Sequence, residues 1–153
     1  MRQLRIGSAI FALLLVPGLA ANRAEPLPDL YVRKVTFQLA DSCLPRRPVY
    51  WFQVTVSNRG IAPSPAISAR ALVTVMDQDG SNWRNGGVLG AIPPGGSATA
   101  SIPVYYLAAN PAHMRIAAPH PFRATADPLH LVPELNETNN MSGMINVPAP
   151  RGC

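Results

Sequence analysis

The sequence predicts an all-β protein built as an antiparallel β-sandwich, and three observations lead to this fold class. First, 17 prolines and 11 glycines among 153 residues are typical of short segments joined by tight turns. Second, beyond the N-terminal segment no stretch keeps apolar residues at the helical spacing of about 3.6 residues, so no substantial helix is expected. Third, runs rich in β-branched and aromatic residues recur about every ten residues, with turn residues between them.

Residues 1–20 have the organisation of a secretory signal peptide. Two arginines precede an apolar run over 6–16, and a Pro-Gly pair then ends the run ahead of small residues. The run is much shorter than the roughly 20 apolar residues that a membrane-spanning helix needs. We therefore expect export with cleavage, a mature protein that is periplasmic or secreted and does not span the membrane, and a loose leading segment over 21–28.

The first two predicted strands differ in the clarity of their pattern. The segment 49–58 is the strongest, because it is dense in β-branched and aromatic residues. Alternation places four of its side chains toward the core, namely Tyr50, Phe52, Val54 and Val56. In the segment 30–39 both faces mix apolar and polar residues, as is typical of an edge strand.

Further strands are predicted at 69–76, 88–92 and 97–107. The segment 77–87, DQDGSNWRNGG, is expected to be a long polar loop, and a Pro-Gly turn precedes the strand at 97–107. The last element is a hairpin over 122–147, in which two alternating segments flank a turn rich in acidic and amide residues.

Strands of this number and spacing predict a seven-stranded, immunoglobulin-like antiparallel sandwich over residues 29–148, with a short C-terminal tail over 149–153. The formal net charge of +5 falls to +3 when Arg2 and Arg5 of the signal segment are removed, because 11 basic residues then face eight acidic ones. No basic run is interleaved with aromatic residues, so nucleic acid is not an expected partner.

Five sequence segments follow one another along the chain, and they are PDLYVRKVTF, FQVTVSNRGIAPSP, ALVTV, IPPGGSATASIPV and ADPLHLVPELNETNN. In this order they resemble the CARDB family, the cell adhesion related domain found in bacteria. Its members typically show a V-x-N-x-G turn, a P-G-x-S start of a strand and a terminal D…V-x-E-x-N-E-x-N-N run. The resemblance covers roughly residues 28–148 and implies an immunoglobulin-like domain of exported bacterial proteins. It supplies no catalytic residues.

The resemblance also bears on Cys43 and Cys153. In immunoglobulin-like sandwiches the first strand commonly lies beside the last, partly in parallel, and each cysteine follows one of these strands by a few residues. Two cysteines in an exported chain most often pair. We therefore expect a Cys43–Cys153 disulfide, which would stabilise the fold by about 4–5 kcal/mol in the chain-entropy description. The alternative is a free or intermolecular thiol near the C-terminus.

The turn of the last hairpin is the first candidate site. Its oxygen-bearing side chains include Asp127, Glu134, Asn136 and Glu137, which are donors of the kind that Ca²⁺ prefers. Their spacing does not follow a known calcium loop. Asp and Asn side chains also bind nearby backbone groups in turns, and we favour this structural role over calcium binding.

The second candidate is Trp83, flanked by Asn82 and Arg84 in the loop over 77–87. An aromatic side chain between an amide and a guanidinium suits contact with a carbohydrate or a protein. It equally suits a cap over the end of the sandwich.

Catalytic patterns are not found in the sequence. The three histidines lack the spacing of a zinc site, and no serine lies in a Gly-x-Ser-x-Gly motif. We therefore expect no enzyme activity and no obligatory cofactor. The predicted function is binding or adhesion to a protein or glycan of the cell envelope. The alternatives are an accessory subunit that pairs through an edge strand and a calcium-stabilised carbohydrate-binding module.

Overall fold

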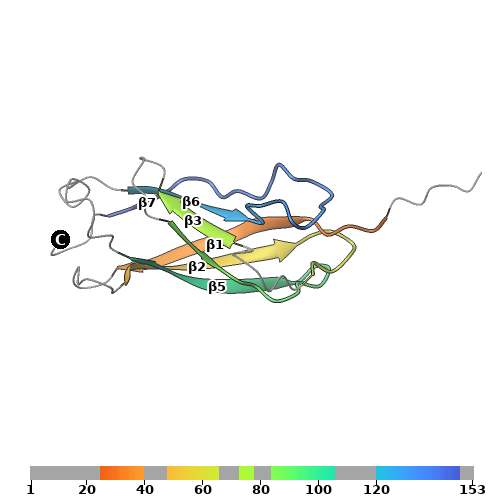
Figure 1. The fold of residues 1–153 in the computed structure, drawn as a ribbon, viewed down its shortest axis with the longest axis horizontal. Coiled ribbons are helices and arrows are strands. Elements are labelled where there is room, and N and C mark those ends of the chain that lie inside the picture. Colours follow the sequence, from red (N-terminus) through yellow and green to blue (C-terminus); the bar gives the residue numbers. More distant parts are fainter. Residues whose placement is uncertain (1–24, 40–47, 66–72, 78–83, 106–119, 149–153) are drawn as a thin grey trace, which may run out of the picture.

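The computed structural model describes residues 25–39, 48–65, 73–77, 84–105 and 120–148. Within these ranges the chain forms β-strands and no helix (Figure 1). The strands are β1 (Leu30–Leu39), β2 (Pro48–Asn58), β3 (Val73–Asp77), β4 (Arg84–Gly87), β5 (Ser97–Tyr105), β6 (His120–Ala126) and β7 (Ile145–Val147).

The strands form two antiparallel sheets. A three-stranded sheet has the order β1-β2-β5, and a four-stranded sheet has the order β4-β3-β6-β7. Figure 1 shows one sheet stacked on the other along most of their length. The prediction of an all-β chain with antiparallel sheets is confirmed.

The core lies between the central strands β2 and β6. Tyr50, Phe52, Val54 and Val56 of β2 are all fully buried, as the alternation predicts. The ring of Phe122 from β6 lies 4.9 Å from the ring of Phe52 and 5.4 Å from that of Tyr50, centroid to centroid. Such aromatic pairs contribute about 0.5–1.5 kcal/mol beyond the burial of their area, so this cluster joins the two sheets.

Strand β1 is an edge strand, as predicted. Apolar and polar residues are mixed on both of its faces because the strand contains a bulge. Its register against β2 shifts between Val32 and Lys34, so that Arg33 is an extra residue in the strand. A bulge of this kind moves the inward positions by one residue. Val32 packs against the core before the bulge, whereas Val35 and the following alternate residues do so after it.

The fourth strand lies where the sequence predicted a loop, and the predicted strand at 88–92 was wrong. Leu89 and Ile92 are buried there without strand pairing. Strand β4 instead includes Gly86 and Gly87, which the sequence suggested as turn residues. A Cβ atom on Gly87 would lie 3.0 Å from the Cβ of Ala100 on β5. The glycine therefore allows the two sheets to approach each other at this side.

The segment over 21–28 was expected to be loose, but its last two residues are hydrogen-bonded to the sandwich. The carbonyl of Leu27 accepts hydrogen bonds from the backbone N–H of Ile61 and Ala62, and that of Pro28 accepts one from Leu135. The signal segment over 1–20 and the tail over 149–153 lie outside the described residues. The part of the chain that the structure describes contains no helix long and apolar enough to cross a membrane.

Candidate functional site

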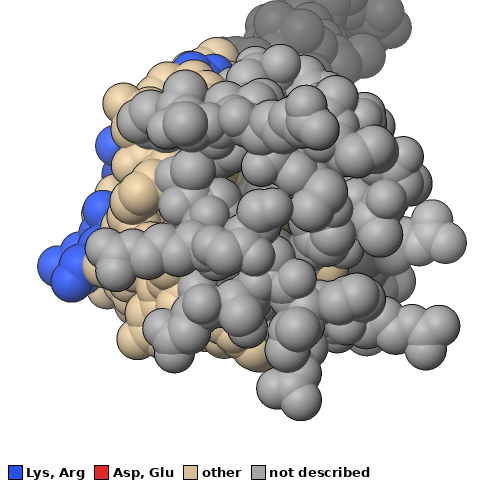
Figure 2. Space-filling view, turned by 90° about the vertical axis from the view of Figure 1, so that its left-hand side faces the viewer, with Lys and Arg blue, Asp and Glu red and all other residues tan. Residues whose placement is uncertain are grey.

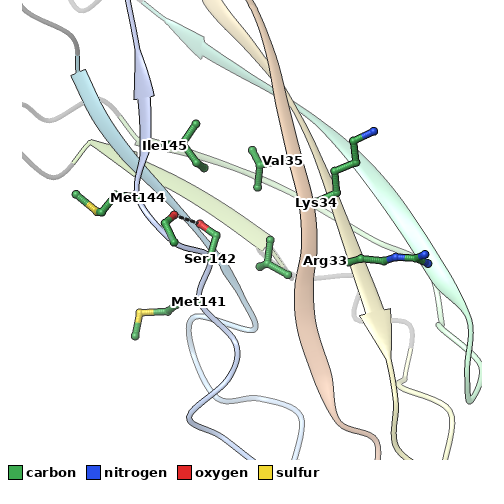
Figure 3. Close-up of a pocket in the computed structure, with 9 residues that line it drawn as sticks. Arg33, Lys34, Val35, Met141, Ser142, Met144 and Ile145 are labelled. Carbon is green, nitrogen blue, oxygen red and sulfur yellow. Dashed lines mark hydrogen bonds between the residues drawn. The ribbon is translucent and has the colours of Figure 1, made fainter.

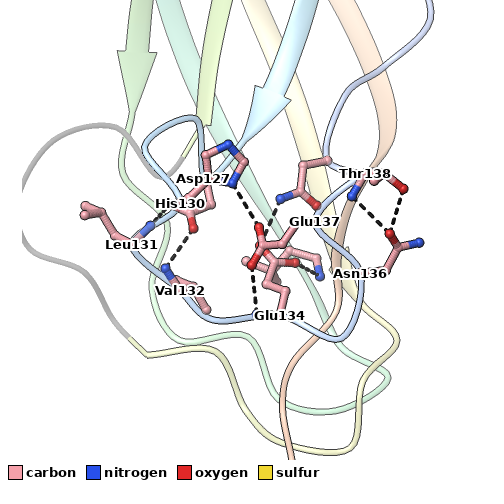
Figure 4. A network of polar contacts seen from close by, with 10 residues as sticks. Asp127, His130, Leu131, Val132, Glu134, Asn136, Glu137 and Thr138 are labelled. Carbon is pink, nitrogen blue, oxygen red and sulfur yellow. Dashed lines mark hydrogen bonds and ion pairs between the residues drawn. The ribbon is translucent and has the colours of Figure 1, made fainter.

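The acidic corner, residues 127–140 between β6 and β7, begins at Asp127 (Figure 4). This residue has a φ of 37°, in the left-handed region that Asp tolerates better than most residues. Its carboxylate accepts hydrogen bonds from the backbone N–H groups of Leu131 at 3.1 Å and Val132 at 2.8 Å, and its carbonyl accepts one from His130 at 3.0 Å. Asp127 is buried, with 2% of its surface exposed, and its carboxylate provides the hydrogen-bond acceptors for the backbone N–H groups of the turn.

Glu134 joins the corner to the start of the first strand. One carboxylate oxygen accepts a hydrogen bond from the backbone N–H of Leu30, and the other accepts one from the Asn140 side chain at 3.0 Å. Only 8% of the residue is exposed. Burial raises the pKa of Glu134 to about 7, opposed by these two hydrogen bonds and assisted by the charges of Glu137 and Asp127.

The remaining polar side chains of the corner bind one another. One oxygen of Glu137 accepts a hydrogen bond from the backbone N–H of Glu134 at 3.1 Å, and the other lies 2.9 Å from Nδ1 of His130. That contact raises the pKa of the exposed His130 above its ordinary value. Asn136 Oδ1 accepts hydrogen bonds from the backbone N–H and the hydroxyl of Thr138.

A second polar centre, Asn58, lies at the same end of the sandwich, and sequence reasoning did not single it out. Asn58 is buried at the end of β2. Its Oδ1 accepts hydrogen bonds from the backbone N–H of Asp29 at 3.0 Å and of Gly60 at 2.9 Å. Its Nδ2 donates to the carbonyls of Ala62 at 2.7 Å and Ile92 at 2.9 Å. The V-x-N-x-G pattern was the available signal, since one amide thus satisfies four backbone groups.

Asp29 connects this centre to the acidic corner. Its carboxylate accepts a hydrogen bond from Nδ2 of Asn139 at 2.7 Å and forms an ion pair with Nε of Arg59 at 2.6 Å. The guanidinium of Arg59 also lies over the ring of Tyr31, 5.4 Å from its centroid. The beginning of β1, the end of β2 and the acidic corner therefore form one hydrogen-bonded unit.

The four candidate calcium ligands share a single turn, but their oxygens point to hydrogen-bond donors. Asp127, Glu134 and Glu137 each accept from backbone N–H groups. Among the described residues, no three Asp, Glu, His or Cys side chains lie close enough together to hold a metal ion. These hydrogen bonds are of the kind expected for the structural role, in which polar side chains satisfy the turn, and the calcium hypothesis stays a prediction.

Several other predicted residues cannot be placed. Asn82, Trp83, Cys43 and Cys153 lie outside the described residues. Arg84 begins β4, but its side chain also lies outside what the structure describes. The contact proposed for this loop and the Cys43–Cys153 disulfide stay predictions.

The structure also contains a groove that the sequence did not indicate (Figure 3). It has a volume of about 310 Å³ and is lined by residues 32–35 of β1 and residues 141–145, which lead into β7. The first and last strands lie on the two sides of this groove, as expected, but they do not pair in parallel. Among the described residues β1 pairs with β2 and β7 pairs with β6, each at the edge of its own sheet.

Comparison with known proteins places the fold. No protein-family model and no curated protein sequence matches this chain. Among solved structures, the chain is similar to a domain of a "putative cell surface protein" from Methanosarcina acetivorans, solved by NMR in solution. The TM-score is 0.55 at 19% sequence identity, over 82% of this chain and 94% of that domain. The likeness is one of fold: both chains arrange β-strands in the same way.

Proposed function

We propose that this chain is an exported, non-catalytic binding or adhesion module of the CARDB type, which contacts a protein or a glycan of the cell envelope. The observation that carries the proposal is the likeness in fold to a domain of a protein named for the cell surface, over 94% of that domain. The signal-like segment over 1–20 and the CARDB-like order of motifs support the same function.

The polar corner supports a binding role over a catalytic one. A catalytic carboxylate must reach the proton or atom on which it acts. Both oxygens of Glu134 and of Asp127 are instead hydrogen-bonded within the fold. Burial raises the pKa of Glu134 to about 7, a value that can mark a catalytic acid or base, but the residue is only 8% exposed and both its oxygens bind groups of the fold.

One observation favours a second candidate, the accessory subunit that pairs through an edge strand. The edge of β1 borders an open groove, and an exposed edge is the surface that an added strand uses. This candidate shares export and the absence of catalysis with the first.

The test is fractionation and cross-linking of the tagged full chain in its native host. We expect N-terminal sequencing to find a mature chain beginning near residue 21, located in the periplasm or the medium, and cross-linked to an envelope protein or glycan. A chain lacking residues 1–20 is the control and is expected to remain in the cytoplasm. An uncleaved full chain in the cytoplasm, or an exported chain without any envelope cross-link, would overturn the proposal.

A further inference from the structure

The groove between the two sheet edges, called here the β1–β7 seam (residues 32–35 and 141–145), is an opening in the part of the sandwich that the structure describes. On the other side of the molecule, Gly87 lets β4 approach β5 so closely that a Cβ would be 3.0 Å from the next side chain. The seam instead leaves a volume of about 310 Å³ between the edges. Figure 3 shows Val35 and Ile145 reaching toward this space from its two walls.

Both walls of the seam present main-chain groups. Among the described residues β1 pairs with β2 alone, and alternate N–H and C=O groups of an edge strand point away from its neighbour. On the opposite wall, Ser142 is held to β6, because its N–H donates to the carbonyl of Ala124 and its hydroxyl accepts from the N–H of Ala124, and it lines the groove. The seam can therefore supply the hydrogen bonds that an extended chain needs.

The seam is also where the core is incompletely covered. Three side chains that line the seam and pack against the core are only partly buried, and they are Val32, Val35 and Ile145. Beside them, Met141 and Met144 are 54% and 48% exposed. Methionine adapts its shape to an apolar partner more readily than branched side chains do. An added strand with small or apolar inward side chains would bury this strip.

The basic side chains beside the seam favour a partner strand that carries acidic side chains. Arg33 and Lys34 lie at the bulge of β1, and Figure 3 shows their side chains pointing away from the groove, toward the outer face of the sheet. Side chains opposite each other on neighbouring strands attract when their charges differ and repel when they match. A second copy paired around this point would bring basic residues together, which is a common protection of natural sheet edges.

The acidic side chains of the corner do not neutralise this surface. Both carboxylate oxygens of Asp127 and of Glu134 accept hydrogen bonds within the corner and from the start of β1. At the end of the molecule away from the corner, Figure 2 shows Lys and Arg along one margin and no acidic side chain in view among the described residues. A partner with acidic side chains is therefore favoured over a second copy of this chain.

We propose that the β1–β7 seam binds an extended segment of a partner protein by strand addition to β1. Small or apolar side chains of that segment face Val32 and Val35, and acidic side chains lie across from Arg33 and Lys34. This inference rests on the proposed function, because it assigns the site and the partner chemistry of the same binding role.

The experiment uses short synthetic peptides and the folded protein. The probe alternates Glu with Val. One control alternates Lys with Val, and a second repeats the Glu–Val peptide with N-methyl groups on alternate backbone nitrogens, which removes main-chain pairing. Binding is followed by fluorescence anisotropy, and the site by NMR shifts of the amides at 32–35 and 141–145. We expect the Glu–Val peptide alone to bind and to shift those amides.

Two variants test the assignment. Arg33→Glu with Lys34→Glu is expected to weaken the Glu–Val peptide about tenfold, equivalent to about 1.4 kcal/mol, and to gain binding of the Lys–Val peptide, which only a folded protein can do. Thr99→Glu with Ser101→Glu adds acidic groups to the outer face of β5, which β2 separates from β1, and is expected to change affinity less than twofold.

Failure of the inference is distinguishable from failure of the proposed function. No binding of the Glu–Val peptide, or equal binding of its N-methylated form, would overturn strand addition at the seam. So would an Arg33→Glu, Lys34→Glu protein that binds the Glu–Val peptide as tightly as the unaltered chain does. If the envelope cross-link survives in that variant, the binding function stands and the seam is not its site.

Discussion

Substitution of Glu134 by glutamine is predicted to remove most of the pH dependence of stability. The pKa of Glu134 is raised from 4.5 to about 7 in the folded protein. A folded state that holds a proton more firmly than the unfolded chain loses stability as pH rises, here between about pH 4.5 and pH 7. At 1.36 kcal/mol per pKa unit the full shift corresponds to about 3 kcal/mol. We expect about 1–2 kcal/mol, because water at the protein surface screens part of the effect.

Glutamine can keep the hydrogen bonds of Glu134, because a neighbouring amide oxygen has no hydrogen-bond partner in the wild-type protein. Its carbonyl can accept the hydrogen bond from the N–H of Leu30, as Glu134 does. Asn140 Oδ1 is buried and has no hydrogen-bond partner. Rotation of that amide would let it accept from the NH₂ group of the introduced glutamine, whereas the wild-type pair uses the Asn140 Nδ2 donor. Glu134→Gln should therefore keep both hydrogen bonds without a buried charge.

The assay is urea unfolding of both proteins at pH 5, 6, 7 and 8. The free energy of unfolding of wild type should fall across this range relative to Glu134→Gln, which should be the more stable of the two at pH 8. His130 has a raised pKa, so the stability that its charged contact with Glu137 contributes also falls as pH rises. Because both proteins contain His130, their difference isolates Glu134. Parallel curves for the two proteins would refute the reasoning.

The remaining predictions concern stability and the untested sites. Asn58→Ala removes four hydrogen bonds to backbone groups, although the Ile92 carbonyl keeps the one from the N–H of Ser64, so unfolding free energy should fall by about 2–4 kcal/mol in urea titration; a loss below about 1 kcal/mol would contradict this role. Gly60→Ala places a Cβ 2.5 Å from the Leu27 carbonyl, and thermal melting should show a large loss that Ile61→Ala, an exposed neighbour, does not. EDTA should leave the melting temperature unchanged, whereas a rise with added Ca²⁺ would argue for a calcium site. Non-reducing mass spectrometry should find Cys43 linked to Cys153, and two free thiols would disprove the pair.

Sequence periodicity predicted the central strand well and the edges poorly, for physical reasons. The alternation at Tyr50, Phe52, Val54 and Val56 reflects a strand that contacts the opposite sheet on one face only, and the structure buries all four. In β1 the bulge at Arg33 shifts that alternation by one residue, and nothing in a single sequence marks where the shift occurs.

Glycine caused the error in β4. Gly86 and Gly87 were assigned to a turn because glycine tolerates unusual backbone angles. At Gly87 the relevant property is instead the missing side chain, which makes room for Ala100 and Ile102 of β5. Which of the two properties is used depends on the neighbouring strand, and the sequence does not identify that neighbour.

The acidic corner was recognised as a turn, but its long-range partners were not. Asp127 binds residues four and five positions later, within the reach of local reasoning. Glu134 and Asn139 bind Leu30 and Asp29, 104 and 110 residues away. The seam likewise joins residues that are distant in sequence, since residues 32–35 of β1 and residues 141–145 line it from different sheets.

These distant bonds have a consequence for when the protein can fold. The N–H of Leu30 has its partner in Glu134, and the carbonyl of Pro28 has its partner in Leu135, so the start of β1 is completed by residues from the last part of the chain. Chains whose contacts join distant residues fold slowly, because the intervening loop must close first. Until residue 135 is made, this end of the sandwich stays open. Late closure suits the proposed exported protein, since it lengthens the time in which the chain is still unfolded enough to be translocated.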